Sequence, residues 1–275
     1  FIDGGDPKET DEATRLLHEA GYKGLDGQTT NPSLVAKNPD IAAQIEEGNK
    51  LTKDTLLSKY REIVQKIEKS APGDISIEVY ADANTTADEM VEQAREMNSW
   101  IESAVIKLPT IEAGLEAAEQ LKGEMKLNMT LCFSQQQAAA VYAATSGASH
   151  PVFVSPFVGR LDDAGFDGMQ HVRNVLQMYK QGDGHTHVLS ASFRRQESFL
   201  ETIRLGVQAV TINFDLFGPW AKEGFPLEVN YSSDGKDIPY QEIDITQDWR
   251  SFDIQHELTE VGLQKFADDW NSLIR

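Results

Sequence analysis

The chain has 275 residues, of which 40% are hydrophobic, and its formal net charge is −19. This length is typical of one large α/β domain, and the apolar fraction is enough to fill its core. So acidic a chain is repelled by nucleic acid and by anionic membrane surfaces, which argues against both as partners. The sequence has no run of about 18 apolar residues, so we expect no membrane-spanning segment.

The cysteine content and the start of the sequence bear on the compartment. Cys132 is the single cysteine, which excludes an internal disulfide and suits a reducing environment. The first residues lack the basic-then-apolar pattern that is typical of a secretion signal. We therefore predict a cytoplasmic protein. A homo-oligomer is compatible with the sequence.

Short apolar segments and amphipathic segments alternate along the whole chain. The apolar segments, which we interpret as strands, are residues 1–2, 24–25, 75–80, 104–108, 127–133, 152–158, 187–193 and 209–214. Apolar residues recur at helical spacing in residues 11–20, 86–98, 111–121, 135–144, 169–180, 196–205 and 256–273. Eight β-then-α units predict a (β/α)8 TIM barrel that forms a single domain over residues 1–275.

Two stretches depart from this regular alternation. Residues 33–70 contain two helical patterns where one is expected. Residues 217–253, after the eighth strand, are polar, aromatic and interrupted by Pro and Gly. We interpret them as an insertion that covers the mouth of the barrel as a lid, contacts another subunit, or does neither. An open, doubly wound sheet is the alternative fold, but Gly4 and Gly5 are too sparse for its phosphate-binding turn.

Polar residues occur at the ends of the predicted strands, where (β/α)8 barrels have their active sites. Side chains two residues apart share a face of a strand, so several of these groups can point inward together. In chain order they are Asp3, Thr30 and Asn31, Glu78, Lys107, Asn128 and Thr130, Ser155 and Arg160, and Ser190, Ser192 and Arg194. The apolar Phe157 is in phase with Ser155. The presence of polar side chains at the ends of successive strands favours an active site at that end of the barrel.

Lys107 is the most informative of these residues because it lies within the apolar segment 104–108. Burial of an ammonium group is costly unless the group is paired or neutral, and a neutral amine is a nucleophile toward carbonyls. A lysine that points into a polar cleft would therefore indicate a Schiff-base enzyme. The alternatives are a side chain that reaches water and an ion pair with Glu78. Arg160 and Arg194 could likewise be surface ion pairs in so acidic a protein.

Metal and cysteine chemistry are less favoured. His185 and His187 have a spacing that metal sites use, but they come before the apolar part of the seventh strand, at the structural end of the barrel. The other histidines form no evident ligand set. Cys132 lies in a predicted buried strand with no histidine nearby in sequence. We therefore predict neither a metal nor another cofactor.

Seven motifs resemble those of the transaldolases, which are Schiff-base enzymes on a (β/α)8 barrel. They are FIDGGD (residues 1–6), TTNPSL (29–34), IEV (77–79), IKL (106–108), NMTL (128–131), SPFVGR (155–160) and ASFR (191–194). The motifs occur in the family's order through most of residues 1–195, and TTNPSL and SPFVGR are the most specific. Residues 256–266 resemble the last helix of the smaller members.

The resemblance implies a role for each matching residue. Lys107 would form a Schiff base with a ketose carbonyl, and Asp3 would take the proton of the C4 hydroxyl as the C3–C4 bond breaks. Glu78 and Thr130 would hold a water molecule that shuttles protons. The remaining residues would bind substrate: Asn31 and Asn128 the dihydroxyacetone unit, Ser155 the site beside the lysine, and Arg160, Ser192 and Arg194 the phosphate.

The resemblance also implies a reaction of the pentose phosphate pathway, which uses sugar-phosphate substrates. A dihydroxyacetone unit would pass from fructose 6-phosphate or sedoheptulose 7-phosphate to an aldose phosphate. Fructose-6-phosphate aldolases share the scaffold but have tyrosine in place of Phe157 and glutamine in place of Glu78, so both residues favour transfer. A relative with another donor, such as a sulfonated ketose, and a barrel that binds sugar phosphate without turnover are the alternatives.

Overall fold

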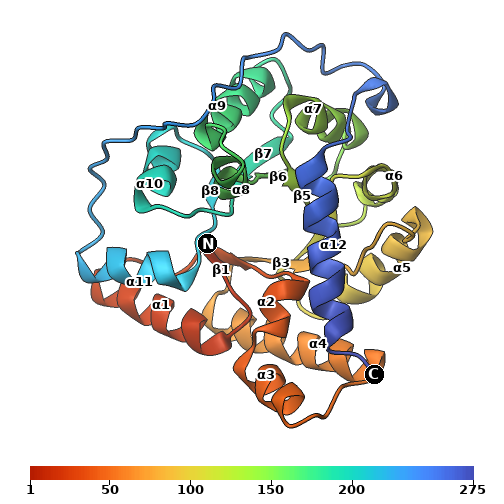
Figure 1. The fold of residues 1–275 in the computed structure, drawn as a ribbon, viewed down its shortest axis with the longest axis vertical. Helices are drawn as coiled ribbons and strands as arrows, with labels where there is room; N and C mark the ends of the chain where they lie inside the picture. Colours follow the sequence, from red (N-terminus) through yellow and green to blue (C-terminus); the bar gives the residue numbers. More distant parts are fainter.

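A computed structural model describes residues 1–275. Eight parallel strands lie side by side in sequence order, and helices surround them (Figure 1). Parallel pairing of Ile2 with Ile212 joins the first strand to the segment after the eighth. The strands are β1 (Ile2–Asp3), β2 (Gly27–Thr29), β3 (Asp74–Glu78), β4 (Ala104–Pro109), β5 (Leu127–Cys132), β6 (Val152–Pro156), β7 (Thr186–Ser190) and β8 (Ala209–Val210). The predicted (β/α)8 fold is therefore confirmed.

Most of the surrounding helices begin at a residue whose side chain caps the first turn. Thr86 forms a capping box with Glu89, and the Ser134 hydroxyl accepts a hydrogen bond from the backbone N–H of Gln137 at 3.1 Å. Such caps define the path of the chain as it leaves each strand. The helices are α1 (Pro7–Glu19), α2 (Pro32–Ala36), α3 (Pro39–Glu46), α4 (Lys53–Ser70), α5 (Ala87–Asn98), α6 (Glu112–Leu121), α7 (Gln135–Ala144), α8 (Val158–Asp163), α9 (Gly168–Tyr179), α10 (Gln196–Arg204), α11 (Phe214–Lys222), the 3₁₀ helix η1 (Trp249–Ser251) and α12 (Glu257–Ser272).

The second and eighth strands differ from their predicted positions for reasons that the structure shows, and β6 and β7 end at Pro156 and Ser190, two and three residues before their predicted ends. The second strand is β2 rather than residues 24–25, because Gly27 permits a close approach: a Cβ there would lie 2.3 Å from the carbonyl oxygen of Asp74. The eighth strand ends at Val210 because the side chain of Asn213 caps the helix that follows. The positions of β2 and β8 thus depend on a backbone contact and on a helix cap, which cannot be predicted from the pattern of apolar residues.

Residues 33–70 form three helices rather than the two predicted. α2 has only five residues, which is too short to give a clear period. The side chain of Asn38 then caps α3 by accepting a hydrogen bond from the backbone N–H of Asp40 at 3.1 Å. Pro39 at the first helical position reinforces this second start. The cap at Asn38 therefore separates α2 from α3, which the sequence pattern did not distinguish.

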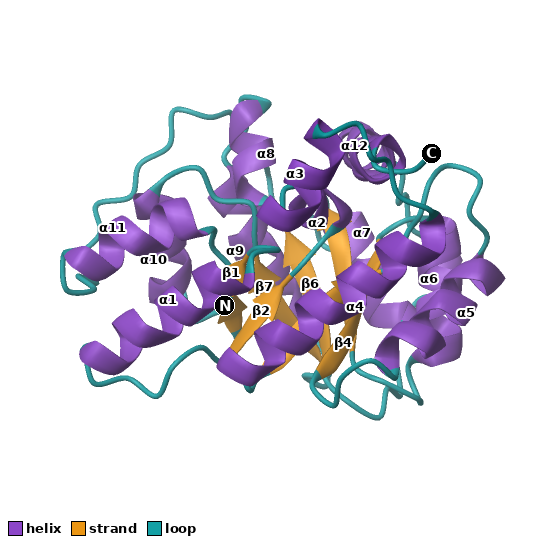
Figure 2. Cartoon of the chain, turned by 90° about the horizontal axis from the view of Figure 1, so that it is seen from below, coloured by secondary structure: helices purple, strands orange, loops and turns teal.

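The segment that follows α11 runs around the outside of the barrel, past α10, α9 and α7 (Figure 1). The hydroxyl of Tyr231 donates to Asp167 at 2.7 Å, and Asn174 Nδ2 donates to the carbonyl of Ile238 at 2.7 Å. The chain then enters α12, which lies beyond the strand ends together with α8 (Figure 2). Residues 217–253 therefore do not cover the mouth of the barrel. That position is taken by α12, whose Lys265 and Phe266 line the cavity there.

The barrel interior has an apolar layer that lies two residues before the cavity-lining residues Lys107, Ser155 and Ala191. Val105, Phe153 and Leu189 are buried in contact with one another, and Phe1 and Ala209 pack against them. A larger apolar cluster forms the core of the rest of the molecule. No helix combines the length and the apolar character needed to cross a bilayer. Two residues after Val105 and Phe153 on the same strands are the polar residues Lys107 and Ser155.

Candidate active site

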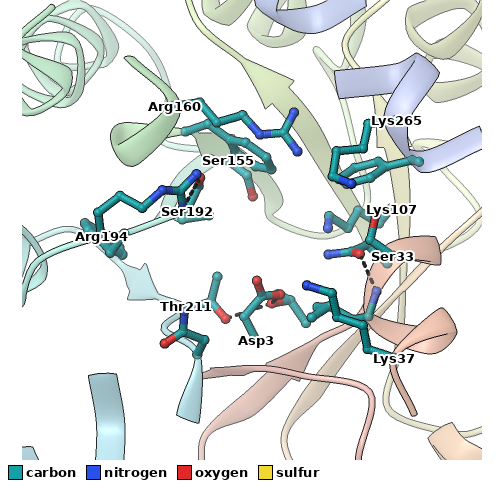
Figure 3. Close-up of a pocket in the computed structure, with 18 residues that line it drawn as sticks. Asp3, Ser33, Lys37, Lys107, Ser155, Arg160, Ser192, Arg194, Thr211 and Lys265 are labelled. Carbon is teal, nitrogen blue, oxygen red and sulfur yellow. Dashed lines mark hydrogen bonds between the residues drawn. The ribbon is translucent and has the colours of Figure 1, made fainter. Parts of the chain in front are cut away.

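A cavity at the carboxyl ends of the strands brings most of the predicted site residues together (Figure 3). The predicted residues that line it are Asp3, Asn31, Lys107, Ser155, Phe157, Arg160, Ser192 and Arg194. Glu78, Asn128 and Thr130 do not line it and are buried among the neighbouring strands. One cavity thus collects side chains from segments that are far apart in the sequence.

Lys107 faces the cavity and is only 3% exposed. Its Nζ lies 2.9 Å from Glu78 Oε2 and donates a hydrogen bond to the carbonyl oxygen of Thr30 at 3.2 Å. Glu78, Lys107 and Asn128 are direct partners across β3, β4 and β5, so they form one row of the barrel. The structure excludes a lysine that extends to bulk water, and the ion pair with Glu78 coexists with a position in the cavity.

The two carboxyl groups near Lys107 are difficult to ionise. Burial raises the pKa of Glu78, and the charge of Lys107 acts against this rise. Burial also raises the pKa of Asp3, which Lys107 and a hydrogen bond from Thr29 oppose. That hydrogen bond runs from Thr29 Oγ1 to Asp3 Oδ1 at 2.6 Å. Both carboxyl groups therefore hold a proton more readily than exposed ones do.

The two asparagines occupy different positions. Asn31 caps α2 by accepting a hydrogen bond from the Leu34 backbone N–H at 2.9 Å, and its side chain also lines the cavity. Asn128 Nδ2 donates to Ser76 Oγ at 3.1 Å, and Asn128 Oδ1 accepts from Ser155 Oγ at 2.7 Å. Asn128 therefore lies one hydrogen bond behind Ser155.

Two buried oxygens near the lysine have no hydrogen-bond partner in the protein. They are Thr130 Oγ1 and Glu78 Oε2. The contact between Glu78 and Lys107 has the distance of an ion pair but not the angles of a hydrogen bond. Buried polar groups nearly always have a partner, so a polar substrate atom or a water molecule is expected to supply one.

Gly159 brings α8, which follows β6, into contact with the loop after β7. A Cβ there would lie 2.1 Å from the carbonyl oxygen of Ser192, and the Gly159 N–H donates to this oxygen at 2.7 Å. Arg160 follows directly, so it reaches the same part of the cavity as Ser192 and Arg194. Arg194 also forms the surface ion pair that we considered, 2.9 Å from Asp163. Arg160 has no acidic partner within 4.0 Å.

The prediction that Ser190, Ser192 and Arg194 share one face does not hold for Ser190. Leu189 belongs to the interior apolar layer, so Ser190 points to the other face of β7. Ser192 has a φ of 63°, in the left-handed region that non-glycine residues rarely adopt. This conformation interrupts the alternation, and residues 191–194 all line the cavity. Strained backbone of this kind is concentrated at functional sites.

Basic residues from α2 and α12 also line the cavity, and sequence reasoning did not find them. Lys37 directly follows α2, and Lys265 lies on α12 beside Phe266 (Figure 3). Lys265 Nζ is 3.2 Å from Asp269, whereas Lys37 has no acidic partner. A signal was present, because Lys37 comes shortly after the TTNPSL motif. For Lys265, nothing in its own segment shows that α12 crosses the barrel mouth.

Cys132 and the histidine pair lie outside the cavity. Burial raises the pKa of the Cys132 thiol to about 12, which disfavours the reactive thiolate at neutral pH. His185 comes just before β7, and its Nδ1 lies 2.5 Å from Asp183. The predicted position of this histidine, at the end of the barrel opposite the cavity, is confirmed.

Comparisons with known proteins bear on this site. Among solved structures, an enolase of the mandelate racemase subgroup from Agrobacterium tumefaciens covers 81% of this chain and 56% of its own. Its TM-score is 0.48 and its sequence identity is 13%, a likeness too low to bear on function. A family model described as Transaldolase/Fructose-6-phosphate aldolase matches residues 1–275.

Curated relatives agree with this family model. A "Probable transaldolase" from Anaeromyxobacter sp. (strain Fw109-5) is 36% identical over 275 residues, which cover 99% of this chain and 97% of the relative. Proteins with the same name from Dehalococcoides mccartyi and Bdellovibrio bacteriovorus are each 34% identical. They cover 90% and 93% of this chain, and 89% and 92% of their own lengths. The chain therefore belongs to the transaldolase/fructose-6-phosphate aldolase family of enzymes.

Proposed function

We propose that this protein is a transaldolase that transfers a dihydroxyacetone unit from a ketose phosphate to an aldose phosphate through a Schiff base on Lys107. Fructose 6-phosphate and sedoheptulose 7-phosphate are the proposed donors. The observation that supports the proposal most is a buried lysine paired with Glu78 in a cavity that Asp3 shares and that arginines border. A binding protein has no evident need for a buried lysine.

The pairing of Lys107 with Glu78 offers a way to form the nucleophile. An ammonium group must lose a proton before it can attack a carbonyl. Glu78 Oε2 lies 2.9 Å from the lysine nitrogen, and burial raises the pKa of this carboxyl. Transfer of the proton from Lys107 to Glu78 would leave a neutral amine, which can attack a carbonyl, and a neutral acid.

Carbon–carbon cleavage needs a base and an electron sink. Attack by Lys107 on the ketose C2 and loss of water give a protonated imine. Asp3 then takes the proton of the C4 hydroxyl, and the electrons of the C3–C4 bond move toward the imine nitrogen. An aldehyde leaves and an enamine stays on the lysine. Asp3 lines the same cavity as Lys107, which supports its assignment as this base.

The two unpartnered oxygens suit proton movement during imine formation. Thr130 Oγ1 and Glu78 Oε2 are buried and form no hydrogen bond within the protein, although Glu78 Oε2 is in ion-pair contact with Lys107. A water molecule held between them would carry protons to and from the carbinolamine, the intermediate that loses water to form the imine. The same groups would move protons in the reverse direction when the product imine is hydrolysed.

Substrate recognition divides between polar and charged groups. Asn31, and Asn128 through Ser155, are suited to the hydroxyls of the dihydroxyacetone unit. Arg160, Arg194 and Ser192 are suited to a phosphate, because guanidinium groups form charge-assisted hydrogen bonds with its oxygens. These local cations would attract an anionic substrate to a chain whose net charge is −19.

Phe157 favours transfer over simple cleavage. Its ring lines the cavity and lies 5.6 Å from the ring of Phe133. A phenyl group has no proton to give the enamine, so the enamine would persist until an acceptor aldehyde arrives. An aldolase is the second candidate, and product analysis separates the two. Faster formation of free dihydroxyacetone from fructose 6-phosphate than transfer to erythrose 4-phosphate would favour the aldolase.

Borohydride trapping tests the central step. Incubation with fructose 6-phosphate and sodium borohydride should reduce the imine, and peptide mass analysis should place the added dihydroxyacetone unit on Lys107. The same treatment without sugar is the control. Absence of the adduct under conditions of measurable turnover, or its presence on another lysine, would overturn the proposal.

A further inference from the structure

Arg160 differs from the other arginine at the cavity because its guanidinium has no acidic partner. Arg194 is paired with Asp163, whereas Arg160 forms no ion pair or side-chain hydrogen bond in the protein. Its guanidinium carbon lies 5.2 Å from the ring centre of Phe157 and 5.3 Å from that of Phe266. Two aromatic rings therefore hold the group, and its N–H donors stay available for a ligand.

Gly262 provides the space for this guanidinium. A Cβ at Gly262 would lie 2.4 Å from Arg160 Nη1 and 2.7 Å from a methyl carbon of Leu131. The backbone of Gly262 is an ordinary part of α12 and its φ is not positive, so the conformation alone does not call for glycine. Glycine is unfavourable inside a helix, and the space it leaves for Arg160 offsets this cost.

The position of α12 is fixed relative to the barrel at this point. Thr259 Oγ1 donates to the carbonyl oxygen of Leu131 at 3.0 Å and accepts from Gln137 Nε2 at 2.8 Å. Further along the helix, the hydroxyl of Ser33 donates to Asp269. Contacts at both ends hold Gly262 and Phe266 over the cavity.

We propose that Gly262 and Phe266 of α12 position the Arg160 guanidinium, and that α12 thereby determines selectivity for phosphorylated over unphosphorylated substrates. The inference rests on the proposed function of Arg160 as a phosphate ligand. It adds a specificity element that lies outside the seven sequence motifs. Both are positioning residues, because they act on the substrate through Arg160.

The substitution Gly262→Ala tests the proposal. The new methyl group meets the far ends of two flexible side chains, so the fold should persist while the guanidinium moves. The KM for erythrose 4-phosphate should rise by about tenfold, the value of one charge-assisted hydrogen bond, with kcat nearly unchanged. The KM for unphosphorylated erythrose should stay the same. Val261→Ala, at the neighbouring residue that is 56% exposed, is the matched control.

Two further variants keep the proposal open to refutation. Phe266→Leu removes one ring from the guanidinium and should raise the same KM by about two- to fivefold. The double variant of Gly262→Ala and Arg160→Ala should bind erythrose 4-phosphate no more weakly than Arg160→Ala alone, because both changes remove the same interaction. Additive effects in the double variant would overturn the proposal.

The outcomes separate this inference from the proposed function. If Gly262→Ala leaves both KM values unchanged while Arg160→Ala raises only that for erythrose 4-phosphate, the positioning role is wrong and the phosphate assignment stands. If Arg160→Ala also leaves that KM unchanged, the phosphate assignment fails and the inference fails with it. Borohydride trapping on Lys107 tests the Schiff base independently of both results.

Discussion

The barrel interior contains two neighbouring layers of side chains, two residues apart along the strands, of which one is apolar and the other is polar and charged. In the apolar layer, Val105 and Phe153 are buried and pack with Leu189. Two residues further along β4 and β6, on the same face, stand Lys107 and Ser155 of the cavity. In the first layer, burial stabilises the fold through apolar contact. In the second layer, burial is costly to charged groups, and it raises the pKa values of Glu78 and Asp3 beside Lys107.

The largest effect that we predict in the polar layer comes from Lys107→Met. Without the amine no imine can form, so kcat/KM should fall by on the order of 10⁴-fold or more, and borohydride should trap no adduct. Steady-state kinetics and mass analysis provide the measurements. Lys126→Met is a suitable control, because Lys126 pairs with Asp74 at 2.7 Å at the other end of the barrel. Retention of a trapped adduct in Lys107→Met would contradict the assignment.

The next largest effect is expected from Asp3→Asn. Loss of the proposed base should lower turnover by about 10²–10⁴-fold, whereas borohydride should still trap the first covalent adduct. Rapid-quench analysis of that adduct, compared with steady-state turnover, separates the two steps. An Asp3→Asn variant that neither cleaves nor forms the adduct would place Asp3 in imine formation instead.

The same substitution has a consequence for stability. Burial raises the pKa of Asp3 above that of the unfolded chain, so ionisation of Asp3 disfavours the folded state. The free energy of unfolding therefore decreases as pH rises from the unfolded value, 3.8, through the raised folded value. Urea titrations across pH should show a smaller decrease for Asp3→Asn than for the parent protein. Equal decreases would indicate that Asp3 is not desolvated.

In the apolar layer we expect the opposite pattern from Leu189→Ala. Leu189 is fully buried, so its truncation should lower the free energy of unfolding by about 2–5 kcal/mol. The variant should still form the Lys107 adduct, and its kcat should stay close to that of the parent protein at temperatures where it is folded. Urea denaturation and steady-state kinetics test both statements. A large fall in kcat in the folded variant would show that the two layers are mechanically coupled.

The smallest effect comes from His171, a buried titratable group on α9 outside the cavity. Burial lowers its pKa from 6.5 to about 4. The unfolded chain binds this proton more readily, so the free energy of unfolding should fall by up to about 3 kcal/mol as pH drops from 6.5 to 4. His171→Leu should lose less stability over this range. An unchanged acid-side slope would mean that other groups dominate it.

The amino-acid sequence determined the order of strands, the row of Glu78, Lys107 and Asn128, and the positions of Arg160 and Arg194 near one another. These features follow from strand alternation and from parallel connections, which are local rules with fixed periods. Motif resemblance added the roles proposed for these residues, and the family assignment agrees with it. The position of β2 and the short α2 escaped prediction, because β2 contains no apolar run and both elements are too short to show a period.

Only the tertiary structure decided which residues complete the mouth of the cavity. The left-handed backbone at Ser192 interrupts the strand alternation through contact with Gly159, and α12 places Gly262 against Arg160. These arrangements depend on close approaches between segments far apart in the chain. A local pattern records which residues can be buried, but it carries no information on which distant backbone will meet them.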